Sequence, residues 1–82
     1  MEKKNVEISV SITEDDRDTV ATTLLALKGE QFEAIGRARR NPADPPSPLV
    51  GEELAIARAL AKLEARLMEA AREKIEQFVA PS

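Results

Sequence analysis

Three arginines close together in the sequence, Arg37, Arg39 and Arg40, could bind an anion. In an extended segment Arg37 and Arg39 share one face. A planar guanidinium group binds phosphate or carboxylate through two parallel hydrogen bonds. The favoured interpretation, however, is a solvated sheet face on which these residues pair with Glu7 or Glu33 across strands. The alternative is that the three arginines bind nucleic acid or a phosphate-containing ligand.

Other residue types that carry chemistry are missing or are explained by structure. The chain contains 0 Cys and 0 His, which excludes a thiolate nucleophile or a Cys zinc site and removes the usual general base. The carboxylates of Glu52 and Glu53 suit the first turn of a helix, where the helix dipole favours negative charge. The acidic residues between 14 and 18 lack the glycine and the final glutamate of a calcium loop. We therefore expect no catalytic residue, no metal site, no cofactor and no enzymatic activity.

The size and charge of the chain narrow the classes of partner. With 82 residues, residues 1–82 are expected to form a single domain. The 12 basic and 15 acidic residues give a net charge of −3, which makes nucleic acid an unexpected partner, because nucleic-acid-binding domains are strongly basic. The sequence has neither an apolar run of the about 18 residues that a membrane span needs nor the apolar core of a signal peptide. We expect a cytoplasmic protein without a membrane partner.

Patterning predicts three strands, at about 5–13, 18–28 and 30–40. In the first, Val6, Ile8, Val10 and Ile12 alternate with polar residues, which predicts one buried and one solvated face. A short polar break and a tight turn at Lys28, Gly29 and Glu30 are short enough to make neighbouring strands antiparallel. In the third strand, Gly36 marks a place where another backbone comes close.

A proline-rich crossover at 41–50 leads to one long helix at about 52–79. Asn41 and Pro42 suit a turn, Asp44 can accept hydrogen bonds or bind Arg39 or Arg40, and Gly51 can cap the helix. Those four loop residues, Asn41, Pro42, Asp44 and Gly51, are therefore assigned a structural role. The residues expected on the sheet-facing side of the helix are Ile56, Leu60, Leu63, Leu67, Ala71, Ile75 and Phe78. The helix is longer than the strands and should extend beyond the sheet.

The fold class predicted is α+β, a three-stranded antiparallel sheet (β-β-β-α) packed on one long C-terminal helix. The first helical turns are apolar nearly all round, and three strands cover only one side of a helix. A second stripe, with the overhanging end, is therefore a candidate interface, most simply with a second copy in a two-fold dimer. The candidate interface residues are Leu54, Ala61, Ala65, Met68, Ile75 and Phe78. The alternative is that alanine is present only as a strong helix former.

The segment from Gly36 to Leu60, GRARRNPADPPSPLVGEELAIARAL, resembles a family of small bacterial proteins classed as domain of unknown function 1876. That family carries a pattern like G-x-A-R-x-N-P-x-D, a proline-containing spacer and [IV]-G-[DE]-E-L-A-x-A-R-A-L. The resemblance implies a β-β-β-α fold grouped with double-stranded-RNA-binding-domain-like (dsRBD-like) folds, and it implies no activity or cofactor.

The resemblance would suggest RNA binding, but the residues argue against it. RNA-binding members of the wider fold present basic residues at the start of the final helix, where this chain has Glu52 and Glu53. The function expected from the sequence is therefore an uncharacterised, non-enzymatic module that forms homo-oligomers or binds other proteins.

Overall fold

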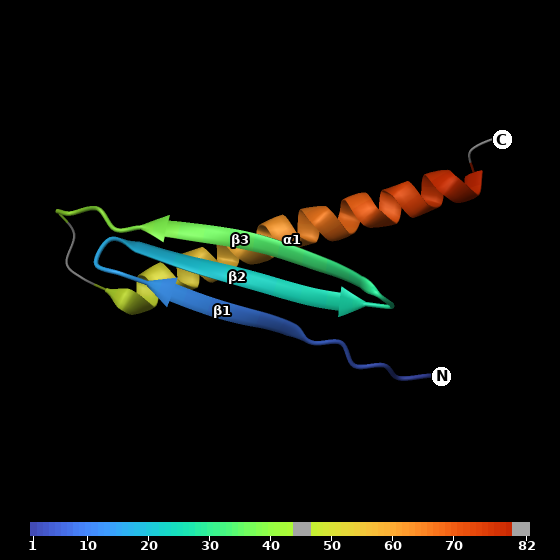
Figure 1. The fold of residues 1–82 in the computed structure, drawn as a ribbon, viewed down its shortest axis with the longest axis horizontal. Coiled ribbons are helices and arrows are strands. Elements are labelled where there is room, and N and C mark those ends of the chain that lie inside the picture. Colours follow the sequence, from blue (N-terminus) through green and yellow to red (C-terminus); the bar gives the residue numbers. More distant parts are fainter. Residues whose placement is uncertain (44–46, 80–82) are drawn as a thin grey trace.

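The computed structural model, described here for residues 1–43 and 47–79, contains three strands and one helix. The strands are β1 (Ile8–Glu14), β2 (Asp18–Leu27) and β3 (Glu30–Arg39), and the helix is α1 (Pro48–Val79). The strands form one antiparallel sheet in the order β1-β2-β3, and α1 runs diagonally across one face of it (Figure 1). This arrangement confirms the predicted α+β fold class.

The turn between β2 and β3 follows from its two residues. Leu27 pairs with Glu30, so only Lys28 and Gly29 connect the strands. Both have positive φ, 45° and 85° respectively, which is the conformation of the two-residue turns that match the twist of a hairpin. The hairpin places β3 beside β2, in reach of the helix that follows.

The helix begins at Pro48, earlier than the predicted start at 52. Proline is well tolerated in the first helical turn, because the N–H it lacks would have no intrahelical partner there. Gly51 therefore lies inside α1 and is not its cap, and its N–H donates to the carbonyl of Ser47 over 3.3 Å. Glu52 and Glu53 consequently lie beyond the first turn, where the helix dipole acts more weakly.

The core is built largely from alanine. One cluster joins Ala21 and Ala38 of the sheet to Ala55 and Ala59 of α1, and a second joins Leu25, Ala34 and Leu63. A Cβ atom on Gly36 would meet backbone atoms of Ala55 and Ala59 at distances that real Cβ atoms do not reach. The close approach predicted at Gly36 is thus confirmed, with α1 as the approaching backbone.

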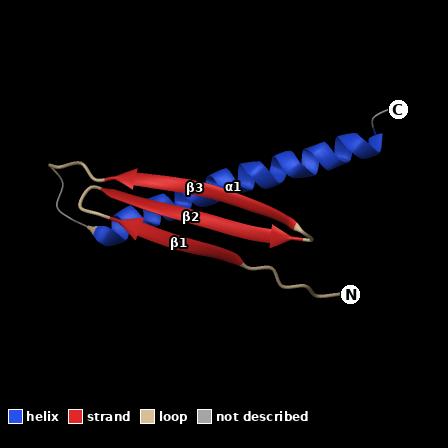
Figure 2. Cartoon of the chain, in the orientation of Figure 1, coloured by secondary structure: helices blue, strands red, loops and turns tan. Residues whose placement is uncertain are grey.

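Leu63 and Leu67 lie on the sheet-facing side of α1 as predicted, but in the first turns this side differs from the prediction by about one residue. Ala55 and Ala59 are fully buried, whereas Leu60, predicted on that side, is 39% exposed. The shift has a physical reason, since only small side chains fit where the helix backbone lies against Gly36. Ile75 and Phe78 are exposed because the C-terminal part of α1 continues past the sheet, as Figure 2 shows.

The expected buried face of β1 is also wrong. The alternation is present, and the register places Ile8, Val10 and Ile12 opposite the buried residues Leu25, Thr23 and Ala21. Yet every residue of β1 is exposed, because α1 packs mainly on β2 and β3. The helix side of β1 is therefore an apolar sheet surface without a cover.

Candidate functional site

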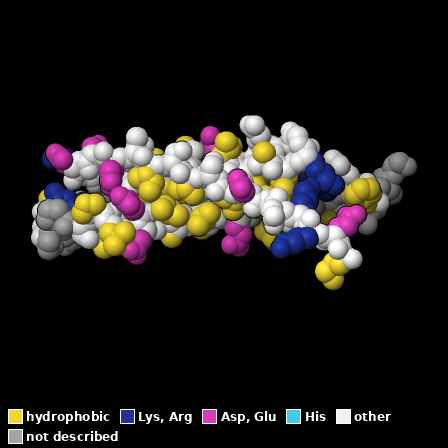
Figure 3. Space-filling model, turned by 90° about the horizontal axis from the view of Figure 1, so that it is seen from below, with side chains coloured by type: hydrophobic (Ala, Val, Ile, Leu, Met, Phe, Trp, Pro, Cys, Tyr) yellow, Lys and Arg dark blue, Asp and Glu magenta, His cyan; other side chains and the backbone are white. Residues whose placement is uncertain are grey.

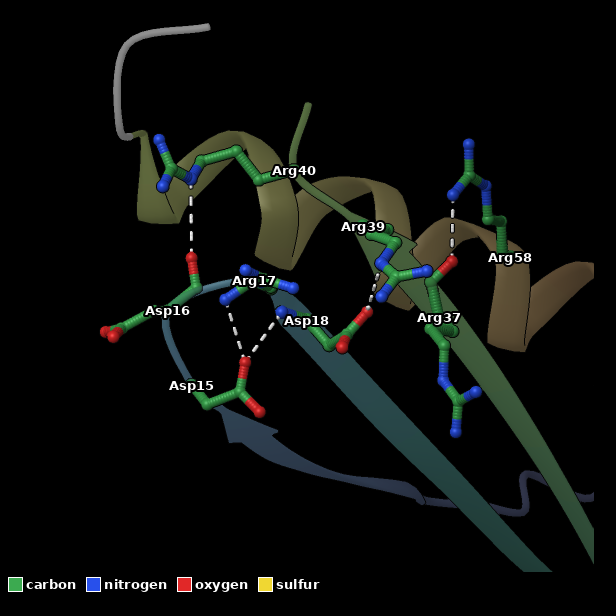
Figure 4. A network of polar contacts seen from close by, with 8 residues as sticks. All are labelled: Asp15, Asp16, Arg17, Asp18, Arg37, Arg39, Arg40 and Arg58. Carbon is green, nitrogen blue, oxygen red and sulfur yellow. Dashed lines mark hydrogen bonds and ion pairs between the residues drawn. The ribbon is translucent and has the colours of Figure 1, made fainter. Parts of the chain in front are cut away.

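A polar cluster forms where the β1–β2 turn meets the end of β3 (Figure 4). Asp15 Oδ1 accepts hydrogen bonds from the N–H groups of Arg17 and Asp18, each over 2.8 Å. These two backbone hydrogen bonds lower the pKa of Asp15. The Asp15 carboxylate thus stabilises the backbone of its own turn. Within residues 1–43 and 47–79, no group of three or more acidic side chains could hold a metal ion.

The three predicted anion-binding arginines do not converge on one point. Arg39 Nε lies 3.7 Å from Asp18 Oδ1, its direct cross-strand neighbour, so the ion pair is with Asp18 and not with the expected Glu7 or Glu33. Arg40 Nε donates to the carbonyl of Asp16 over 3.3 Å. The guanidinium group of Arg37 points away from both of the others (Figure 4).

A cavity of about 720 Å³ lies between this turn and the start of α1. Arg17, Arg39 and Arg40 line it together with Glu14, Asp15 and Asp16. Its rim therefore carries both signs of charge in equal number. Such a rim does not select anions in the way a purely basic pocket would.

The carboxylates of Glu14 and Glu52 meet at the same end, a contact that was not predicted from the sequence. A hydrogen bond with the Glu14 side chain and the nearby charge of Glu14 raise the pKa of Glu52. Thr19 Oγ1 also donates to Glu14 Oε2 over 3.4 Å. No spacing in the sequence could reveal this pair, because it joins the end of β1 to the second turn of α1.

The residues predicted for the crossover have different roles. Asn41 Oδ1 accepts a hydrogen bond from the N–H of Ala43 over 3.0 Å, and this bond closes a turn around Pro42. Asp44 lies outside the described residues. A Cβ atom on Gly51 would come within 2.9 Å of Thr19 Oγ1, so the position serves close packing of α1 on β2.

A further apolar surface is formed by Ile8, Val10 and Ile12 on the helix side of β1, together with Val6, which precedes the strand; we call these four residues the β1 strip. All four side chains are exposed. Figure 3 views the molecule from the β1 side and shows hydrophobic side chains gathered along the middle of that face. Contiguous exposed apolar patches of this kind commonly mark interaction sites.

The helix stripe predicted as an interface is exposed along its whole length. Leu54 is 44% exposed, Met68 58%, and Phe78 at the overhanging end 89%. Ala61 and Ala65 are exposed between them, and Ile75 is 61% exposed. Among the described residues, the helix stripe and the β1 strip are thus both exposed apolar surfaces, and only the one on the helix was predicted from the sequence.

Within the described residues, no helix is long and apolar enough to cross a membrane.

Comparison with known proteins gives the same fold and a family. The crystal structure of Rv2632c superposes with a TM-score of 0.93 at 38% sequence identity, covering 100% of this chain and 98% of that one. The uncharacterised protein Rv2632c of Mycobacterium tuberculosis is 42% identical over 73 residues, which cover 89% of this chain and 78% of the relative. The uncharacterised protein Mb1767 of Mycobacterium bovis is 36% identical over 69 residues, covering 84% and 73% respectively. These descriptions name no enzymatic activity.

The family expected from the sequence motif is wrong. The family model that matches is described as Rv2632c-like and spans residues 4–82, in place of the domain of unknown function 1876. The match covers the strands and the helix as well as the proline-rich motif. The chain therefore belongs to the Rv2632c-like family.

Proposed function

We propose that this chain is a non-enzymatic interaction module that acts by self-association. The observation that carries the proposal is the β1 strip, an aliphatic surface on the same sheet face as the core but outside the cover of α1. Apolar side chains left exposed in this way lower the free energy of a complex that buries them.

The composition of the core supports the same conclusion. Among the described residues the buried hydrophobic side chains are five alanines and two leucines, Ala21, Leu25, Ala34, Ala38, Ala55, Ala59 and Leu63. The valine and the two isoleucines of β1 are larger than most of these, yet they remain exposed. A small domain with a modest core gains stability by oligomerising, because association buries apolar surface that one chain cannot bury alone.

Anion binding through Arg37, Arg39 and Arg40 has weaker support. Arg39 has a carboxylate partner in Asp18, and Arg40 donates to a backbone carbonyl. The cavity that Arg39 and Arg40 line is also lined by acidic side chains, and Arg37 is not among its lining residues. A dsRBD-like relationship, a cytoplasmic location and the absence of a nucleic-acid partner stay predictions from the sequence.

The first test is the solution mass by light scattering, across a range of protein concentrations and at two salt concentrations. We expect a dimer mass for the wild-type chain. Val10→Glu should shift the mass to that of a monomer, because it places a charge in the middle of the β1 strip. A wild-type monomer at every concentration would contradict self-association.

Two controls separate the candidate surfaces. Thr13→Glu adds the same charge to the same strand but on its other face, and it should leave the dimer intact. Ala61→Glu with Ala65→Glu places charge on the helix stripe. If this double variant dissociates the dimer and Val10→Glu does not, the helix stripe is the interface and the β1 strip is not.

A further inference from the structure

We propose that two copies of this chain pair edge to edge through β1, antiparallel across a two-fold axis that passes beside Ser9, so that their sheets form one continuous sheet. The inference rests on the proposed self-association and names its surface, its partner and its register.

The two edges of the sheet differ in how they are protected. From Ile8 to Thr13, β1 has no charged residue and no proline, and its pairing with β2 runs without a bulge. Proteins normally protect an edge strand with charged residues, prolines or bulges, and an edge strand that lacks them is open to pairing with another strand. The free edge of β1 is therefore a template for a further strand.

The other edge is guarded. β3 carries Glu30, Glu33, Arg37 and Arg39. Arg58 Nη1 of α1 donates to the carbonyl of Arg37 over 2.8 Å, and Lys74 Nζ binds Glu30 Oε1 over 2.7 Å. Charged side chains and the helix thus protect β3, which leaves β1 as the edge available to a second copy.

The sequence of β1 is complementary to itself in one antiparallel register. When Ser9 lies opposite Ser9 of the second copy, Ile8 lies opposite Val10, and Val6 lies opposite Ile12. Every residue of the β1 strip then has an aliphatic cross-strand neighbour on the same face. Centring the pair on Val10 would instead place Val6 opposite Glu14, which leaves one apolar side chain against a carboxylate.

Charge supports the same register. With Ser9 at the centre, Lys4 lies opposite Glu14 of the second copy, on the helix side of the sheet. Glu14 shares that corner with Glu52, and the two carboxylates repel each other there. A lysine ammonium group from the second copy would offset this repulsion at both symmetric ends of the pair. Residues 4–7, which are not part of a strand in the single chain, would extend β1.

Disulfide trapping tests the register directly, because the chain has 0 Cys and a single introduced thiol is unique. Opposed Cα atoms in an antiparallel pair lie about 4.5–5.5 Å apart. This is within the roughly 4.4–6.8 Å range of disulfides. Ser9→Cys should therefore form a covalent dimer under mild oxidation, detected on a non-reducing gel. Ser11→Cys is the matched control, since its two thiols would lie roughly 13 Å apart along the strands.

A charge reversal provides a second test that needs no thiol. Lys4→Glu should weaken the dimer about tenfold, since two symmetric ion pairs become repulsive. Combining Lys4→Glu with Glu14→Lys should restore wild-type affinity, as measured by sedimentation or dilution light scattering. Failure of the double variant to recover affinity would overturn the proposed register.

The outcomes separate this inference from the proposed function. Efficient cross-linking of Ser9→Cys alone, with charge rescue, supports the pairing. If the wild-type chain is a dimer but Ser11→Cys cross-links as well as Ser9→Cys, or neither does, the pairing is wrong and self-association stands. If the wild-type chain is a monomer, both proposals fail.

Discussion

At the scale of single residues, Gly36 decides how closely α1 approaches the sheet. Gly36→Ala would push a methyl group against the backbone of Ala55 and Ala59, so the helix must move away from β3. We expect a loss of about 1–3 kcal/mol in the free energy of unfolding, the usual cost of overpacking. Urea denaturation followed by circular dichroism measures this loss.

Glu33→Ala is the matched control for Gly36→Ala. Glu33 is exposed on the same strand and on the opposite face of the sheet. Its replacement should change the free energy of unfolding by no more than about 0.5 kcal/mol. Equal stability of the two variants would mean that the contact between Gly36 and α1 does not limit packing.

Local chemistry made some residues predictable. The close approach at Gly36 was predicted from the sequence because a glycine inside an alternating strand marks a position where another backbone lies close. Asp18 as the partner of Arg39 was missed, since that pair depends on which residues the turn brings into register. The contact between Glu14 and Glu52 was missed for a stronger reason, because it depends on where the helix crosses the sheet.

At the scale of elements, the junction of β1 and α1 should show a pH dependence. The pKa of Glu52 is raised by Glu14, so folded chains bind a proton at Glu52 at a higher pH than unfolded chains do. The stabilising effect of that proton is present at acidic pH and is lost as the pH rises through the folded pKa. We therefore expect Glu52→Gln to be more stable than the wild type at pH 7, with a difference that shrinks towards about pH 4.

Thermal unfolding at several pH values, at a concentration where the chain is monomeric, measures this difference. Glu53→Gln removes a carboxylate from the neighbouring exposed position and is the control. The pH dependence of stability that arises from Asp15 has the opposite sign, because the lowered pKa of Asp15 gives stability that is lost as the pH falls. A stability gain for Glu52→Gln that is the same at every pH would argue against the carboxylate pair.

Element types were readable from the sequence, but element placement was not. Alternation predicted β1 as a strand, and helical periodicity predicted α1, because both are properties of a local segment. Alternation also suggested that one face of β1 is buried, and this was wrong. Whether Ile8, Val10 and Ile12 are covered depends on the direction of α1 across the sheet, which the small residues Gly36, Ala55 and Ala59 set.

At the scale of the whole molecule, self-association should couple to folding, because the β1 strip forms a surface only in the folded chain and unfolded chains cannot pair through it. The midpoint of thermal unfolding should then rise with protein concentration. Above the dissociation constant, a hundredfold increase in concentration adds about 1.4 kcal/mol per chain. For a domain of this size, this corresponds to roughly 5–10 °C.

Differential scanning calorimetry of the wild type, Val10→Glu and Thr13→Glu tests this concentration dependence. Thr13→Glu should retain the dependence, whereas Val10→Glu should unfold at one temperature at every concentration. A wild-type midpoint that does not change with concentration would show that the exposed aliphatic residues of β1 gain no cover from a second copy.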